Sequence, residues 1–209
     1  MSTMSQMHIR IEGYRELLWH HFSVEALTSS PQGRRKRPGQ AGNDPTEWRR
    51  TALVTDRGQL YIERMAVFGA LREGARYTRD GRSTLQGPLA ATLEVLDDRI
   101  LIDRWFPGYP GAEPFDLRHV EALPIDAREA VYLDIRGVRN PSTKMRNIRY
   151  RVATRPGWHA EFRLRWNSTV LSETQLLAIV HDTGEFVGLG SGRSLGLGRF
   201  TLLDPKPAA

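Results

Sequence analysis

The sequence has 209 residues, 40% of them hydrophobic and 26% charged, which is the composition of one large globular domain or two small ones. It has no cysteine, which excludes disulfides and thiolate chemistry, and no apolar run near the roughly 20 residues of a membrane helix, so we expect a cytoplasmic protein without a membrane partner. The net charge of +6 comes mostly from arginine. Because guanidinium groups bind phosphates and stack on bases, this favours a nucleic-acid partner over a plain compositional bias toward arginine.

The six histidines show no His-x-x-x-His or similar spacing, so the sequence predicts no metal site. No motif predicts a cofactor. The glycine-rich segment described below is neither a Walker loop nor a dinucleotide fingerprint.

The first half of the chain predicts one strand and then a long basic loop. Residues 8–12 alternate polar and apolar, which predicts a strand that ends at Gly13. Residues 29–50 are rich in Ser, Pro, Gly and Asn, and we expect a flexible insertion that is mobile until an acidic partner binds. At its centre is a run of four basic residues, Arg34, Arg35, Lys36 and Arg37.

Regular elements follow. Residues 59–62 predict a short strand, and residues 64–76 predict a helix with one apolar face. Residues 89–96 and 99–102 predict a hairpin with its turn at Asp97-Asp98. Residues 105–128 contain many prolines and glycines, which predicts a second, loop-rich insertion.

A basic hairpin is predicted at residues 131–153, with strands at 131–137 and 148–153 joined by a turn. From Arg136 to Arg165 the sequence holds nine basic residues and one acidic residue. Clustering of this order is typical of a surface that binds a phosphate backbone, and a solvated strand pair is the alternative.

Residues 158–166 show the clearest strand alternation, with apolar residues on one face and His159, Glu161, Arg163 and Arg165 on the other. The nearby aromatic residues Tyr150, Trp158 and Trp166 either stack on bases or belong to the core. Ser172 to Gln175 is a capping box that predicts a helix ending near Gly184, and residues 200–203 predict the last strand. Interleaved strands and helices of this kind indicate an α+β fold of the ferredoxin-like, RNA-recognition-motif-like type.

Between that helix and the last strand lies a glycine-rich loop, residues 188–200, which holds five of the 19 glycines. Glycines at this density exclude a helix or strand interior. Successive backbone N–H groups favour anions, and two arginines lie in the loop, so the loop is predicted to hold a charged backbone; a flexible hinge is the alternative. The residues concerned are Gly188, Gly190, Gly192, Arg193, Gly196, Gly198 and Arg199.

The glycine-rich loop resembles the Gly-x-Gly-x5-Gly-hydrophobic-Gly loop of the CRISPR-associated RAMP superfamily. Residues 60–72, which end in Gly69-Ala70-Leu71-Arg72, resemble the strand-to-helix segment that this family writes as Tyr-Ile-Pro-Gly-Ser-Ser-Leu-Lys-Gly-Ala-Leu-Arg. The chain departs from the family where the family has Pro-Gly-Ser. The resemblance implies a single RAMP-like domain over residues 1–209, with a β-hairpin thumb.

What the resemblance implies most directly is a repeating backbone subunit that oligomerises along a guide RNA in an antiviral CRISPR ribonucleoprotein. Its partners would be single-stranded guide RNA, a complementary target strand, copies of itself and other effector subunits. The thumb maps to the basic hairpin, so the implied RNA-binding residues are the basic run at 34–37, the loop residues named above, and a further group of basic side chains: Arg72, Arg139, Lys144, Arg146, Arg149 and Arg151.

Other functions stay open. A RAMP-type endoribonuclease that processes repeat RNA would use a histidine as general acid or base, and His20 and His21 are the candidates. Some backbone subunits of the family cut target RNA with a loop aspartate and a metal, for which Asp44 is the candidate. A phage or mobile-element protein that coats single-stranded nucleic acid, and a structural protein without nucleic acid, are the remaining alternatives.

Overall fold

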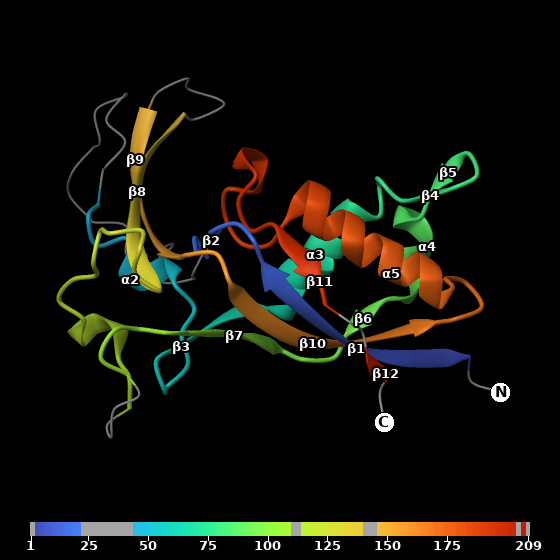
Figure 1. Ribbon diagram of the computed structural model, residues 1–209, viewed down its shortest axis with the longest axis horizontal. Coiled ribbons are helices and arrows are strands. Elements are labelled where there is room, and N and C mark those ends of the chain that lie inside the picture. Colours follow the sequence, from blue (N-terminus) through green and yellow to red (C-terminus); the bar gives the residue numbers. More distant parts are fainter. Residues whose placement is uncertain (1–2, 22–43, 110–113, 140–145, 204–205, 208–209) are drawn as a thin grey trace, which may run out of the picture.

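The computed structural model describes residues 3–21, 44–109, 114–139, 146–203 and 206–207. They form a large antiparallel sheet with helices on one face, and a smaller sheet that projects from one end of it (Figure 1). The strands of the large sheet are β1 (Met4–Gly13), β3 (Gln59–Glu63), β6 (Glu94–Val95), β7 (Arg99–Trp105), β10 (Trp158–Asn167), β11 (Phe200–Leu202) and β12 (Lys206–Pro207). The helices are α2 (Trp48–Thr51), α3 (Arg64–Gly74), α4 (Gln86–Thr92) and α5 (Glu173–Asp182).

Strands far apart in the sequence are neighbours in the large sheet, whose main order is β11-β1-β10-β7-β3. At its centre β1 and β10 pair along their whole length, from Met4 opposite Asn167 to Gly13 opposite Trp158. The short strands β6 and β12 pair with β10 and β1. This arrangement agrees with the predicted mixture of α and β elements.

The predicted alternation in β10 is confirmed, and its apolar face forms the centre of the core. Trp158, Phe162 and Trp166 are all at most 1% exposed. The indole N–H of Trp158 donates to the Arg15 carbonyl and that of Trp166 to the Leu171 carbonyl. Both tryptophans therefore belong to the core and cannot stack on bases.

Helices α3 and α5 are also as predicted and cover this face of the sheet (Figure 1). The capping box of α5 is present, because Ser172 accepts from the Gln175 amide and the Gln175 side chain accepts from the Ser172 amide. Helix α5 continues into a π-helical turn, η2 (Thr183–Val187). A Cβ on Gly74, the last residue of α3, would lie 2.0 Å from Thr183 Oγ1, so glycine is required where α3 meets this turn.

The hairpin predicted at 89–96 and 99–102 is wrong in its first half. Residues Gln86–Thr92 are helix α4, and β6, which follows, pairs with β10 and not with β7. Leu85, Leu89 and Leu93 are all buried, and their spacing of four is that of a helix. The helical period was present in the sequence beside the apolar run that suggested a strand.

The predicted basic hairpin is present as β8 (Val131–Arg139) and β9 (Arg146–Thr154), paired from Val131 opposite Thr154 to Arg139 opposite Arg146. Its turn, with Lys144, lies outside the described residues. Strand β2 (Leu17–Leu18) joins the free edge of β9 and completes the small sheet. The hairpin stands at one end of the molecule with α2 at its foot (Figure 1).

The two insertions are described in part. Residues 22–43, with Arg34, Arg35, Lys36 and Arg37, lie outside the described residues. Glu47 and Trp48 are only 4% and 3% exposed, so the last part of the predicted 29–50 insertion is packed and not a flexible loop. Strand β7 reaches Trp105, and beyond it the described part of 105–128 holds a single 3-10 turn, η1 (Leu117–His119).

A separate two-stranded hairpin, β4 (Arg79–Asp80) and β5 (Ser83–Thr84), follows α3. Across the described ranges no helix has the length and apolar character needed to cross a membrane.

Candidate nucleic-acid interface

The glycine-rich loop is a tightly packed turn and not an open row of amides. All five of its glycines have φ between +69° and +80°, a region that other residues rarely adopt. A Cβ on Gly198 would lie 1.8 Å from the Leu189 carbonyl oxygen. Most of the backbone N–H groups expected to face an anion donate instead to backbone carbonyls: those of Gly188, Leu189, Ser191, Leu195, Gly196, Leu197 and Gly198. Anion binding through the loop is therefore left mainly to its side chains.

The same hydrogen bonds attach the loop to the small sheet. The Ser191 amide donates to the Leu18 carbonyl at 2.7 Å, and the Gly198 amide donates to the Glu16 carbonyl at 2.7 Å. Leu197 packs in a small core with Leu18, Tyr132 and Ala153 of β2, β8 and β9. The loop and the hairpin thus form one continuous surface.

Arg151 is at the centre of this attachment. It was expected on the surface of the hairpin but is only 4% exposed. Its guanidinium lies 3.2 Å from Asp134 Oδ2, and its Nη1 donates to Ser191 Oγ at 3.2 Å. Burial lowers the pKa of Arg151, and the Asp134 carboxylate acts against that shift. Arg151 therefore joins the hairpin to the loop and does not present an exposed charge.

Farther out on the hairpin, arginines of the two strands lie directly opposite one another. Arg136 is opposite Arg149, and Arg139 is opposite Arg146. The positive charges of Arg136 and Arg149 are compensated, because Arg136 pairs with Asp134 and Arg149 lies 3.2 Å from the buried carboxylate of Glu47. Arg146 is exposed, and in the described part of the chain it forms no ion pair. Positive charge thus accumulates toward the tip of the hairpin.

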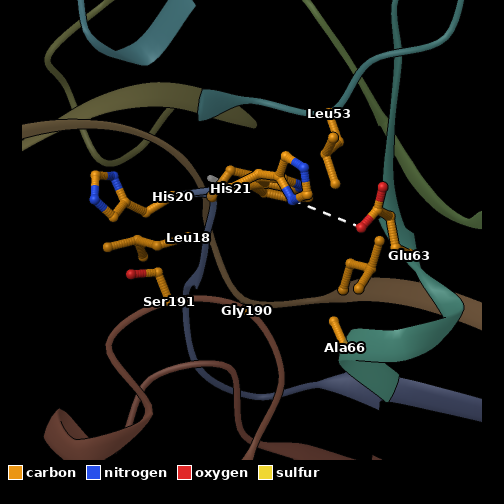
Figure 2. A pocket seen from close by; sticks show the side chains of 10 residues that line it. Leu18, His20, His21, Leu53, Glu63, Ala66, Gly190 and Ser191 are labelled. Atoms are coloured by element: carbon orange, nitrogen blue, oxygen red, sulfur yellow. Dashed lines mark ion pairs between the residues drawn. The ribbon is translucent and has the colours of Figure 1, made fainter. Parts of the chain in front are cut away.

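A pocket lies where β2, the start of α3 and the glycine-rich loop meet (Figure 2). Its volume is about 260 Å³ and its walls are largely apolar, with contributions from Leu18, Leu53, Ile62 and Ala66. Gly190 and Ser191 form the side that belongs to the loop. The two segments that resemble the RAMP superfamily therefore line one cavity.

His20 and His21 both line this pocket, but their rings point in opposite directions (Figure 2). His21 Nδ1 lies 3.6 Å from Glu63 Oε2, whereas His20 lies on the side of Ser191. Desolvation lowers the pKa of His20; Glu47 acts against this shift, and the charges of Arg149 and Arg151 add to it. The two rings do not form a paired acid and base at one point.

Asp44 is occupied by local hydrogen bonds. Its Oδ1 accepts from the Thr46 amide and hydroxyl, and its Oδ2 accepts from Arg50 at 2.7 Å. Burial alone would raise the pKa of Asp44, but these hydrogen bonds and the Arg50 charge lower it. Among the described residues, no three His, Asp or Glu side chains come together as a metal-ligand set.

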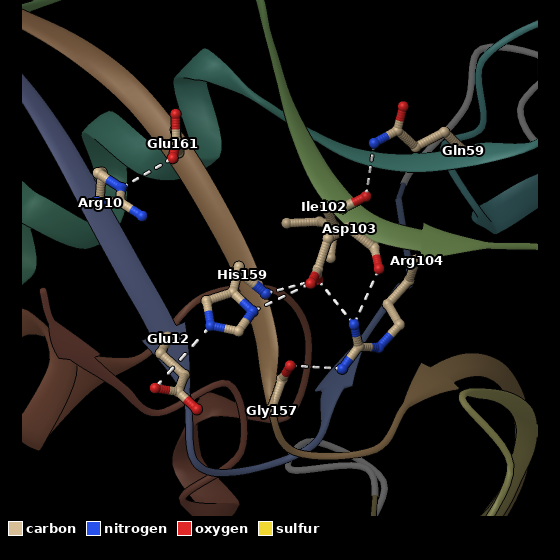
Figure 3. Close-up of polar contacts among 9 residues, drawn as sticks. All are labelled: Arg10, Glu12, Gln59, Ile102, Asp103, Arg104, Gly157, His159 and Glu161. Carbon is tan, nitrogen blue, oxygen red and sulfur yellow. Dashed lines mark hydrogen bonds and ion pairs between the residues drawn. The ribbon is translucent and has the colours of Figure 1, made fainter.

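The polar face of the large sheet carries many charges, but they neutralise one another. His159 lies between Asp103 and Glu12, at 3.0 and 4.0 Å, while Arg10 is 2.9 Å from Glu161 (Figure 3). The two arginines of β10, Arg163 and Arg165, pair with Asp97 and Glu94. The polar face that the alternation predicted for β10 is therefore covered by ion pairs.

The remaining predicted residues lie at separate places. Arg72 is exposed on α3, and Arg193 pairs with Glu73 at 3.0 Å. Tyr150 is half-buried on β9, where its amide donates to Glu47. The sequence prediction missed Glu47, Asp134 and Ser191, which position the arginines. The two-residue period of β8 places Asp134 and Arg136 on one face of the strand. This period was the signal in the sequence that could have identified Asp134 as a partner of the arginines.

No protein-family model matches the sequence, and no curated protein matches it. Among solved structures the chain is similar to a chain in the cryo-EM structure of the Type III-B Cmr-beta bound to cognate target RNA, with 12% identity, a TM-score of 0.44, and coverage of 97% of this chain and 60% of that chain. It is similar to a chain of a Type IV-B CRISPR complex, with 12% identity, a TM-score of 0.43, and coverage of 98% and 91%. It is also similar to Cmr6 from Pyrococcus furiosus, with 11% identity, a TM-score of 0.45, and coverage of 97% and 99%.

Proposed function

We propose that this protein is an RNA-binding subunit of a CRISPR-type ribonucleoprotein, in which it holds the phosphate backbone of single-stranded RNA. The observation that carries the proposal is the position of Arg139 directly opposite Arg146 in the hairpin. Both side chains are exposed, and two arginines opposite one another can contact the same phosphate backbone through charge-assisted hydrogen bonds.

The distribution of charge supports the hairpin over the large sheet as the RNA surface. The arginines of β10 are paired with carboxylates, so a phosphate would have to displace an ion pair there. At the tip of the hairpin the charge is exposed. The RNA path we propose runs from the hairpin across the pocket of Figure 2 to the glycine-rich loop.

The arrangement of the large sheet supports a single RAMP-like domain of the ferredoxin type. Its strands β1, β7, β10 and β11 stand in the order β11-β1-β10-β7, with α3 before β7 and α5 between β10 and β11. This order is the one expected of a β-α-β-β-α-β unit with β3 added at the edge. In this proposal the β8–β9 hairpin is the thumb, and copies of the protein bind side by side along a guide RNA.

Binding suits the geometry of this site better than cleavage does. His20 and His21 point apart, and Asp44 is engaged by Thr46 and Arg50. Titration of the purified protein with labelled single-stranded RNA at rising salt tests the proposal. We expect log K to fall linearly with log salt concentration, and a flat response would show that phosphates are not bound. Longer RNA should bind more copies, as measured by light scattering.

A further inference from the structure

A second hollow, separate from the pocket of Figure 2, lies between the end of α3, the turn η2 and the glycine-rich loop. Its volume is about 600 Å³ and its lining is mainly polar. Gly190 lines both this hollow and the pocket of Figure 2, so the two cavities lie on either side of the same loop residue. A strand of RNA that crosses the loop would pass from one to the other.

Two exposed aromatic rings stand on one side of the hollow. Tyr77, just beyond α3, is 54% exposed, and Phe186, in the π-helical turn, is 52% exposed. Their ring centroids are 5.3 Å apart and the rings are tilted by 42°. Exposed aromatic faces held together in this way are a recurring means of binding bases by stacking, because every base has an apolar π face.

The fold holds these rings in place. Helix α3 ends at Gly74, which touches Thr183 at the start of η2, and Thr183 Oγ1 donates to the Ile179 carbonyl at 2.6 Å. Thr183 and Val187 are buried on either side of Phe186, so the π turn directs Phe186 outward. Single π turns within helices are frequent at functional sites.

Arg199 lines the same hollow. Arg199 forms no ion pair with any carboxylate of the described chain, and its Nη1 is shielded from solvent without a hydrogen-bond partner there. The neighbouring Arg193 differs, since its charge is paired with Glu73 at 3.0 Å. A guanidinium N–H without a hydrogen-bond partner favours a phosphate oxygen, which can accept from it.

We propose that this hollow binds one nucleotide of single-stranded RNA, with its phosphate on Arg199 and its base against Phe186 and Tyr77. This inference rests on the proposed function. The rest of the proposed RNA path consists of phosphate contacts, and this hollow adds one position at which a base is bound by stacking. A stacking site of this kind tolerates all four bases.

The test is RNA binding by four variants of the 209-residue chain: Phe186→Ala, Tyr77→Ala, Arg199→Gln and Phe186→Trp. We expect Phe186→Ala and Tyr77→Ala each to weaken binding by about fivefold or more with an unchanged salt dependence, because a lost stack is not electrostatic. Arg199→Gln should reduce the slope of log K against log salt by about 0.7, the value for one phosphate contact of a single strand. Phe186→Trp should keep the affinity.

Val170→Ala is the matched control, because Val170 is 48% exposed and lies between β10 and α5, outside the glycine-rich loop and the hollow. Its affinity should equal that of the wild type, and thermal unfolding should show that all variants are folded. A complementary measurement is photocrosslinking of RNA that contains 4-thiouridine, followed by mass spectrometry, which should identify Tyr77 or Phe186.

Three outcomes would overturn the inference. If folded Phe186→Ala and Arg199→Gln bind RNA as the wild type does, the hollow is not a nucleotide site, although the proposed function stands. If Phe186→Ala abolishes self-association without changing RNA affinity, the aromatic pair contacts protein. If the wild type binds no RNA at any salt concentration, the proposed function fails together with this site.

Discussion

Arg151 donates from Nη1 to Ser191 Oγ at 3.2 Å, and this hydrogen bond links the basic hairpin to the glycine-rich loop. The same guanidinium pairs with Asp134, and both of these charged side chains are 5% exposed. Two segments that are separate in the sequence therefore hold each other in position through one buried arginine. Any RNA surface made of hairpin and loop depends on it.

We expect Arg151→Ala to lower the free energy of unfolding by about 3–5 kcal/mol, because removing one partner of a buried ion pair leaves the other charge without compensation. Arg146→Ala, on the same strand, should change stability by less than about 0.5 kcal/mol, because Arg146 is exposed. Urea unfolding of both variants measures the difference. Equal stability of the two would mean that Arg151 does not join hairpin and loop.

The burial of Arg151 could not be predicted from the sequence. Alternation in β10 predicted its core face, because a strand buried on one face must repeat every second residue. The same period placed Arg149 and Arg151 on one face of β9, but it carried no information on what would cover that face. The loop that buries Arg151 is 40 residues away in the sequence. Burial of that kind is set by tertiary packing.

The glycine-rich loop was located correctly, but its backbone was expected to face a ligand. Its glycines are needed for positive φ and for close contact with the chain's own carbonyls. Only the three-dimensional packing could show that the loop amides donate to these carbonyls and not to a ligand. Helix α4 was missed for a different reason. A short apolar run fits a strand or a buried helix equally, and the spacing of Leu85, Leu89 and Leu93 decides between them.

Glycines of the loop should differ in their tolerance of a side chain. Gly196 and Gly198 both have positive φ, at 76° and 69°, so alanine is strained at each by about 1–2 kcal/mol. A Cβ at Gly196 meets nothing within 4 Å, whereas one at Gly198 would lie 1.8 Å from the Leu189 carbonyl oxygen. We therefore expect Gly198→Ala to lose clearly more stability than Gly196→Ala in thermal unfolding. Similar losses would show that the loop relaxes and is not fixed by packing.

Charge at the tip of the hairpin should set the salt dependence of RNA binding. Each phosphate contact of a single strand contributes about 0.7 to the slope of log K against log salt, so the double variant Arg139→Ala/Arg146→Ala should lose up to about 1.4. The loss should be similar for RNAs of different sequence, because phosphate contacts carry no base information.

A double variant on the large sheet, Arg163→Ala/Arg165→Ala, is the control for this measurement. It removes the same number of positive charges, but from arginines that are paired with Asp97 and Glu94. Its slope should equal that of the wild type. If the sheet variant loses the slope and the hairpin variant keeps it, the RNA surface is the face shown in Figure 3.

RNA should stay intact when it is incubated with the purified protein. General acid–base cleavage needs a donor and an acceptor positioned around one phosphate, and the rings of His20 and His21 point to opposite sides of the backbone. Desolvation lowers the pKa of His20, which disfavours the protonated ring that a general acid needs. Gel analysis of end-labelled repeat RNA, with the variants His20→Ala and His21→Ala in parallel, is the measurement. Cleavage by the wild type that either variant abolishes would establish an endoribonuclease and refute a purely binding role.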